Sequence, residues 1–187
     1  KQSIYKLSSL HLSVDGNEVS GAYAVWLSST SQPMVMALCR GAVPILEGSS
    51  SEKAKKGAYI LTDFNDSDGK KVLIASSGSE VCICVEAKEL LITCGYNVRL
   101  VSFPCWELFE EQSKEYQQSV MMLQERLKGE VKTVYVEPSS PFGWDKYFDV
   151  HVGMTTFGAS AAKKFVYTHF GFTKENIADK AANAYKQ

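Results

Sequence analysis

Short apolar runs alternate with helical segments along most of the chain, and this alternation constrains the fold more than any other sequence feature. From residue 58 onward, turn residues bound each run, and longer segments with helical spacing separate most of them. Four runs have the pattern of strands: AYILTD (58–63), KKVLIAS (70–76), NVRLVSF (97–103) and KTVYVEP (132–138). The alternation predicts an α/β fold with an open, mostly parallel (mixed) sheet and helices on both faces.

The predicted helices lie between and after these runs. SEVCICVEAKELLITCG (79–95) is predicted as a helix that stops at Gly95, since glycine is the expected C-terminal stop. Further helices are predicted over about 106–127, around GWDKYF (143–148), and near GASAAKKFVYTHFG (158–171) and TKENIADKAANAYK (173–186).

The first fifty residues offer less material for a core. A helix is predicted over EVSGAYAVWLSS (18–29), and its apolar face consists of Val19, Ala22, Tyr23 and Trp26. PMVMALC (33–39) is predicted to be a fully buried strand. The segment 47–58 is small, polar and charged, as linkers are, so we place a domain boundary near residue 50. The predicted units are residues 1–50 and 51–187.

Charge and hydropathy narrow the classes of partner. The net charge is -1 and no long basic or acidic block occurs, which argues against a nucleic acid or an anionic membrane as the partner. No apolar run approaches the roughly 18 residues of a membrane span. Small molecules or proteins are therefore the expected partners. The chain does not begin with methionine, which suggests a piece of a longer protein.

The five cysteines lack the spacing of a zinc site or a redox motif. Their odd number argues for a reducing compartment and against a disulfide framework. We expect them to be small buried hydrophobic residues. They are Cys39, Cys82, Cys84, Cys94 and Cys105.

Arg40 follows the predicted strand 33–39, and ligands of parallel sheets bind at the carboxyl ends of strands. Its guanidinium is a permanent cation whose planar fork fits phosphate oxygens. Gly41 removes side-chain bulk beside it, and Pro44 stiffens the loop that follows. The alternative is an arginine that is solvated or ion-paired for structural reasons.

Two other predicted strand ends carry polar groups. In ASSGSEV (75–81), Ser77 or Ser79 is predicted to cap the following helix and Glu80 to complement its positive end. The same amides could bind an anion, although Glu80 would repel a phosphate. Glu137 is a candidate general base, but a carboxylate satisfied by nearby backbone amides is the preferred interpretation.

The histidines, His11, His151 and His169, are scattered without a carboxylate or cysteine at ligand spacing, and we expect structural roles for them. HVGMTTFGAS (151–160), with Gly153 and Gly158, predicts a tight turn with Ser160 in or near a helix cap. The G-x-S-x-G, Walker and G-x-G-x-x-G patterns are all missing from the sequence.

Several blocks, in order, resemble the C-terminal third of a transketolase. The resemblance covers about residues 15–187, and the first fourteen residues match only weakly. The blocks are DGNEVSGAY, ALCRGAVPILEGSSSEKAKKGAYIL, SSGSEV, VRLVSFPCWELFEEQ, VEPSSPFGWDKYF and GMTTFGASAAKKFVYTHFGFTKENIADKA. By this resemblance, residues 1–50 are the tail of the pyrimidine-binding domain and residues 51–187 are the C-terminal domain.

The resemblance implies an enzyme of the pentose phosphate pathway that transfers a two-carbon ketol unit between sugar phosphates. Such enzymes use thiamine diphosphate and a divalent metal, magnesium or calcium, and work as homodimers. They are typically cytoplasmic, with plastids or other organelles as alternatives. The family's cofactor-binding and catalytic residues lie upstream of this chain, so we expect the chain alone to be inactive and to bind neither cofactor nor metal.

One functional residue carries over by the resemblance. The family's strand ends in Ser-Arg-Gln, whose arginine binds the substrate phosphate, and Arg40 falls in that register. Cys39 and Gly41 replace the serine and glutamine, and Thr155 replaces a residue that is often aspartate. These departures suggest a divergent lineage.

The sequence is also compatible with two alternatives. The first is a related thiamine diphosphate enzyme, dihydroxyacetone synthase or deoxyxylulose phosphate synthase, although GMTTFGAS and SFPCWELFEEQ favour the transketolase group. The second is a non-catalytic module for dimerisation or regulation.

Overall fold

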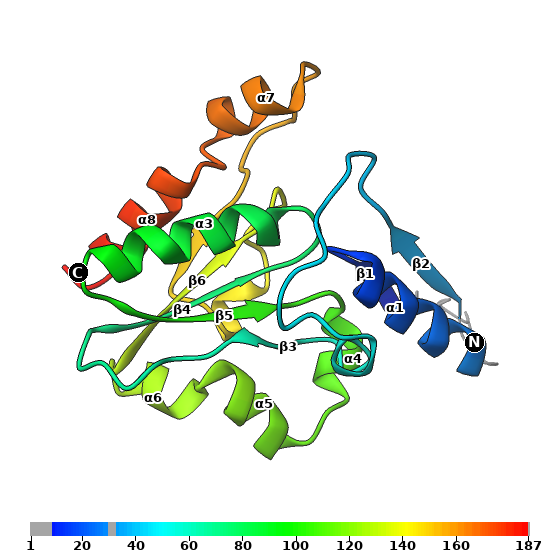
Figure 1. Cartoon of the computed structure of the whole chain (residues 1–187), viewed down its shortest axis with the longest axis horizontal. Helices are drawn as coiled ribbons and strands as arrows, with labels where there is room; N and C mark the ends of the chain where they lie inside the picture. The colour runs from blue at the N-terminus through cyan, green and yellow to red at the C-terminus, as the bar shows by residue number, and fades with distance from the viewer. Residues whose placement is uncertain (1–8, 30–32, 187) are drawn as a thin grey trace, which may run out of the picture.

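A five-stranded sheet is the centre of the computed structural model, which describes residues 9–29 and 33–186 (Figure 1). The strand order is β3-β5-β4-β6-β7. Parallel pairs join β4 to β5, β4 to β6 and β6 to β7, whereas β3 is antiparallel to β5 at one edge. The predicted mostly parallel, mixed α/β sheet is therefore confirmed. The strands are β3 (Tyr59–Thr62), β4 (Lys71–Ser76), β5 (Asn97–Ser102), β6 (Val131–Val136) and β7 (Val150–Val152).

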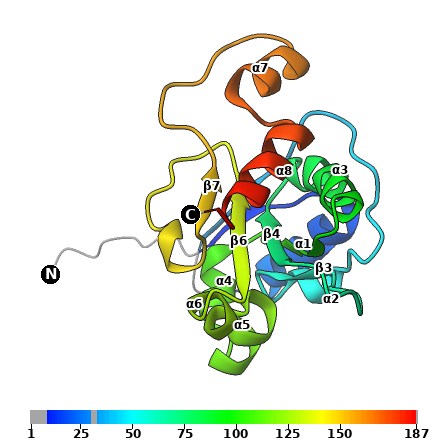
Figure 2. The same cartoon turned by 90° about the vertical axis from the view of Figure 1, so that its left-hand side faces the viewer.

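Helices cover both faces of this sheet (Figure 2). One face packs on α3 (Glu80–Thr93) and α8 (Lys174–Asn183), and the other on α4 (Trp106–Glu110), α5 (Lys114–Met121) and α6 (Leu123–Leu127). Successive residues of β4 alternate between two cores: Val72 and Ile74 face α3, whereas Leu73 and Ala75 join Phe109 and Met121. Burial on both faces explains why β4 and β5 are nearly continuous apolar runs.

The chain that closes the fold contains shorter elements. The 3₁₀ helix η1 (Trp144–Lys146) precedes β7, and α7 (Lys163–Phe170) stands away from the sheet at the top of Figure 1. As predicted, α3 ends just before Gly95, whose φ is +84°. In the described part of the chain, no helix is long and apolar enough to cross a membrane.

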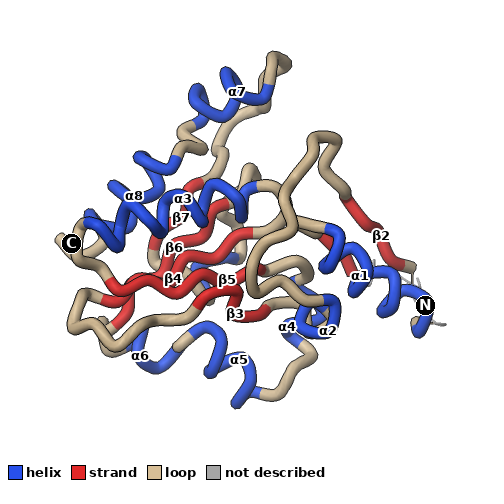
Figure 3. The backbone as a smooth tube through the Cα atoms, in the orientation of Figure 1, coloured by secondary structure: helices blue, strands red, loops and turns tan. Residues whose placement is uncertain are grey.

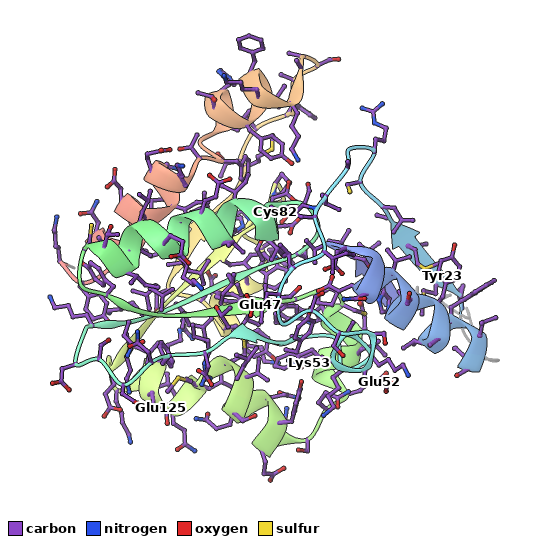
Figure 4. The ribbon with its side chains drawn as sticks, in the orientation of Figure 1. Tyr23, Glu47, Glu52, Lys53, Cys82 and Glu125 are labelled. Atoms are coloured by element: carbon purple, nitrogen blue, oxygen red, sulfur yellow. The ribbon has the colours of Figure 1, made fainter. Side chains whose placement is uncertain are left out.

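A separate two-stranded sheet lies beside the central one (Figure 3). It pairs β1 (Ser9–Leu12) in parallel with β2 (Met34–Ala37). Between these strands runs α1 (Gly16–Ser28), and α2 (Ser51–Ala54) leads into β3. Figure 4 shows Tyr23 on α1, Glu47 on the loop between β2 and α2, and Lys53 on α2.

Three sequence predictions are wrong in detail. The strand predicted over 33–39 is shorter, and it is not fully buried. Val35 and Leu38 are exposed, because β1 is the main packing partner of β2. Tyr23 and Trp26 are likewise exposed on α1, although Ala22 is buried. The predicted helix over 106–127 is three short helices, α4, α5 and α6. The sequence pattern did not predict β1, β7 or α2, because these elements have only three or four residues each.

Candidate functional site

The predicted phosphate ligand Arg40 lies three residues beyond β2, on the exposed loop 38–46. Within the described residues, its guanidinium has no hydrogen bond or ion pair. The local contact is made by its neighbours, since the Cys39 thiol donates to the Gly41 carbonyl over 3.3 Å. A Cβ on Gly41 would meet nothing within 4 Å, so no close neighbour requires glycine there. The planar cation is thus open to a ligand.

The far end of this loop is tied to the start of α1. Asp15 is the N-cap residue, and its Oδ1 accepts hydrogen bonds from the backbone N–H groups of Asn17 (3.0 Å) and Glu18 (3.1 Å). Its Oδ2 accepts a third from the Leu46 N–H at 2.9 Å. Asn17 adds a side-chain bond to Ser49 Oγ at 2.9 Å. The first turn of α1 therefore fixes the chain just after the Arg40 loop.

Glu18, in the same turn, reaches the central sheet. Its side chain is fully buried and accepts hydrogen bonds from the Tyr59 hydroxyl of β3 (2.8 Å), the Ser102 hydroxyl of β5 and the Val14 N–H (2.8 Å). Burial raises the pKa of Glu18, and the bonds from Ser102, Val14 and Tyr59 oppose that rise. Burial and the neighbouring Glu18 raise the pKa of Tyr59. Glu18 thus joins α1 to two strands of the sheet.

A second polar cluster lies at the carboxyl ends of β4 and β6. Glu137 is 8% exposed and accepts a hydrogen bond from the Ser77 hydroxyl. Burial raises its pKa to about 7, although the bond from Ser77 opposes the rise, and Glu80 raises it further. The expectation that backbone amides satisfy this carboxylate is therefore wrong in part, because the Ser77 side chain is a donor.

The serines before α3 do not act as predicted. Ser79 occupies the N-cap position without a side-chain cap, and Ser77 faces Glu137 instead. Glu80 does lie in the first turn, where its carboxylate accepts hydrogen bonds from Ser79 Oγ at 3.1 Å and from the Tyr167 hydroxyl of α7. Because Glu80 already places a carboxylate at this helix start, the geometry disfavours the anion-binding alternative.

The histidines stay apart. His11 is buried, and neither of its ring nitrogens has a partner in the described residues. His151 stacks on Tyr135, and the ring of His169 meets Phe170 edge-on. Burial lowers the pKa of both His11 and His151. Residues 9–29 and 33–186 contain no group of three or more His, Cys, Asp or Glu side chains that could hold a metal ion.

Other sequence expectations hold only in part. Gly153 follows β7, where a Cβ would overlap the His151 ring, and Gly158 lies in the long connection to α7. Ser160 does not cap α7, because Ala162 occupies the N-cap position. Among the cysteines, Cys84 and Cys105 are buried as expected, Cys82 is intermediate, and Cys39 and Cys94 are exposed; all five are free.

Sequence reasoning missed Asp15 and Glu18 as a connection between the two parts of the chain. A signal was present: the acidic residues are three apart at a helix start, which is the spacing of a capping box. The pattern predicts the cap, but it does not predict that Glu18 bonds to Tyr59 and Ser102, since these partners lie 41 and 84 residues away.

Comparison with known proteins gives one consistent family. The family model for the transketolase-like TK C-terminal domain matches residues 57–173. Transketolase 1 of Candida albicans is 45% identical over 172 residues, covering 92% of this chain and 24% of that protein. The chloroplastic transketolase-1 of Arabidopsis thaliana is 40% identical over 171 residues, covering 89% of this chain and 22% of that protein. The chain thus spans about a quarter of the length of the curated relatives it matches.

Solved structures agree with the sequence comparisons. The transketolase of Pichia stipitis in complex with sedoheptulose 7-phosphate superposes with a TM-score of 0.85 and 38% identity, over 95% of this chain and 25% of that chain. The transketolase from Leishmania mexicana gives a TM-score of 0.85 at 39% identity, with the same coverage of both chains.

Proposed function

The chain belongs to the transketolase family, and we propose that it is part of an enzyme that transfers a two-carbon ketol unit between sugar phosphates. Two findings support this: the similarity to transketolases over about nine-tenths of the chain, and the similarity to a structure whose name includes a sugar phosphate ligand. In this account, residues 1–50 end the pyrimidine-binding domain and residues 51–187 form the C-terminal domain.

Arg40 is the residue of this chain that binds the distal phosphate of the sugar. The single observation that carries this role is its exposed guanidinium, which no described side chain pairs, on the loop after a parallel strand. A planar fork makes two charge-assisted hydrogen bonds to phosphate oxygens, which a point charge cannot match. The phosphate is remote from the carbonyl under attack, so Arg40 contributes binding and orientation of the sugar and takes no part in proton transfer.

Thiamine diphosphate and magnesium or calcium bind to other parts of the full-length enzyme. We place the metal ligands in those other parts as well; among the described residues, no three or more His, Cys, Asp or Glu side chains are grouped so that they could hold a metal ion. When bound, the thiamine cofactor supplies the carbanion chemistry of ketol transfer. Calorimetric titration of this chain with thiamine diphosphate and magnesium should show no saturable binding, and transketolase assays should show no activity. One-to-one binding would contradict this assignment.

The assembly we propose is a homodimer in the cytoplasm or in a plastid. Its partners are sugar phosphates, and we propose neither a nucleic acid nor a membrane as a ligand. The plastid is included because the Arabidopsis relative is named as chloroplastic.

The test uses the full-length enzyme with ribose 5-phosphate and with glycolaldehyde, an acceptor without phosphate. Losing a bidentate, charge-assisted contact costs about 2 to 3 kcal/mol, or roughly 30- to 150-fold in kcat/KM. Arg40→Ala should therefore impair the reaction with ribose 5-phosphate by that factor and leave glycolaldehyde almost unaffected, provided that the donor also lacks a phosphate, as hydroxypyruvate does. Arg40→Lys should recover only part of the loss. Equal slowing of both acceptors would refute the phosphate role.

A further inference from the structure

The loop that carries Arg40 has few polar anchors of its own. Its start is held by β2, whose last residue, Ala37, pairs with Leu12 of β1. Between Leu38 and Ile45, the one side-chain hydrogen bond within the described residues joins Cys39 to Gly41, two residues away in the same loop. The position of Arg40 relative to the rest of the protein therefore depends on what holds the two ends of the loop.

The far end is held by Asp15. This side chain is 2% exposed, and its two oxygens have different partners. Oδ1 caps α1, whereas Oδ2 accepts the Leu46 N–H, 31 residues along the chain. The neighbouring Gly16 lies against Ile45, since a Cβ there would be 3.4 Å from Ile45 Cδ1. A buried carboxylate thus fixes the backbone six residues after Arg40.

The first turn of α1 is itself fixed to the central sheet. Glu18 accepts hydrogen bonds from the Tyr59 hydroxyl of β3 and from the Ser102 hydroxyl of β5, and these two strands are neighbours. Backbone bonds reinforce this attachment: the Leu12 N–H donates to the Pro104 carbonyl, and the Gly78 N–H donates to the Leu12 carbonyl, each at 2.8 Å. A continuous set of buried and partly buried bonds therefore runs from the C-terminal sheet through Glu18 and Asp15 to the Arg40 loop.

We propose that Asp15 is a positioning residue for Arg40, and that the C-terminal sheet sets the location of the substrate phosphate through this contact. The inference rests on the proposed function of Arg40. The Asp15 carboxylate touches no substrate; it holds Leu46, and thereby the loop, in the conformation in which the guanidinium meets the phosphate. A displacement of about 1 Å is enough to weaken a bidentate contact substantially.

Asp15→Asn separates the two roles of this side chain in the full-length enzyme. Asparagine is as good an N-cap as aspartate, so its oxygen keeps the bonds from Asn17 and Glu18. Its amide nitrogen then faces the Leu46 N–H. Both groups are donors, so the hydrogen bond to Leu46 is lost. The KM for ribose 5-phosphate should rise about 3- to 10-fold, which is less than the effect of Arg40→Ala. The change in kcat should be smaller than the change in KM. With hydroxypyruvate and glycolaldehyde, kinetics should change by less than about 2-fold.

Two controls make the result decisive. Asn17→Ala removes the tether to Ser49, which lies beyond the loop, and should have no acceptor-selective effect. In an Arg40→Ala background, Asp15→Asn should have no further effect on ribose 5-phosphate, because the residue through which it acts is gone. Asp15→Ser, which also caps but lacks a second oxygen, replaces Asp15→Asn if the latter does not fold.

The outcomes separate this inference from the proposed function. If Arg40→Ala is selective for the phosphorylated acceptor but Asp15→Asn slows both acceptors equally, slows neither, or adds its effect to Arg40→Ala, the positioning role is wrong and the phosphate role stands. If Arg40→Ala itself is not selective, the proposed function of Arg40 fails. A selective Asp15→Asn effect that disappears in the Arg40→Ala background supports the inference.

Discussion

The central sheet and the N-terminal β1–α1–β2 segment contain similar apolar runs but differ in how many elements cover them. In β4, every residue after Lys71 is buried, because α3 and α8 lie on one face and α4 to α6 on the other. In β2, side chains alternate between intermediate and exposed, and Trp26 of α1 is 46% exposed. A strand-like run therefore predicts burial only where the same chain supplies cover for both faces.

Large apolar side chains are exposed towards the other end of the chain as well. Phe142, Phe157 and Phe165, on two loops and on α7, are also exposed. The difference between the regions thus concerns their strands: Lys71 is the one exposed residue in the strands of the five-stranded sheet, whereas every second residue of β2 is exposed.

Deleting residues 1–50 tests whether the covered sheet is self-sufficient. The shorter chain should keep a cooperative thermal transition, because both cores of the sheet come almost entirely from residues after 50. The midpoint should fall by about 10 °C, since Tyr59 and Ser102 lose Glu18 and the core loses Val14. Circular dichroism during heating measures both; a broad transition with dye-binding apolar surface would show that the boundary near residue 50 is misplaced.

Replacing Glu18 tests the connection between the two regions. Glu18→Ala leaves the Tyr59 and Ser102 hydroxyls and the Val14 N–H buried without their acceptor. The free energy of unfolding should fall by about 3 to 5 kcal/mol. Tyr59→Phe is the matched variant: it removes one donor and leaves Glu18 two others, so about 1 kcal/mol is expected. Urea unfolding gives both values, and equal effects of the two variants would contradict a central role for Glu18.

Glu137 provides a smaller, pH-dependent test within the central sheet. Its pKa is about 7 in the folded protein and about 4.3 in an unfolded chain. Because the folded-state pKa is the higher one, protonation stabilises the fold: the contribution is complete below about pH 4.3 and is lost as the pH rises through about 7. The loss amounts to at most about 4 kcal/mol.

Glu137→Gln isolates this contribution, because glutamine stays neutral and can still accept from Ser77. Relative to the variant, the unmodified protein should lose stability between pH 4.5 and 7.5, as thermal midpoints across that range would show. Midpoints that stay parallel across the range would mean that the carboxyl titrates normally.

Local patterns predicted the long elements well. The buried strands β4, β5 and β6 and the helix α3 with its glycine stop follow from apolar periodicity and one special backbone position. Short elements such as β7 were missed because three residues carry too little periodicity, and its parallel pairing with β6 is set by the tertiary structure.

Of the candidate site, the sequence predicted only the cation, Arg40. Arg40 could be singled out as a cation after a strand, but its anchors could not, because Leu46 is 31 residues from Asp15 and Ser102 is 84 residues from Glu18. Side-chain partners at the carboxyl edge were also missed: Ser77 or Ser79 was expected to cap α3, yet Ser77 donates to Glu137, which follows the neighbouring strand β6. Such neighbours cannot be predicted from the sequence alone, because the order of the strands in the sheet decides which side chains meet.

The most direct test of the account compares one residue from each region in the full-length enzyme. Arg40→Ala and Glu137→Gln are assayed with ribose 5-phosphate and with glycolaldehyde, using hydroxypyruvate as the donor. The account predicts a loss of roughly 30- to 150-fold in kcat/KM for Arg40→Ala with ribose 5-phosphate alone, and a ratio between the two acceptors that Glu137→Gln leaves unchanged. A shifted ratio for Glu137→Gln, or an unshifted ratio for Arg40→Ala, would contradict it.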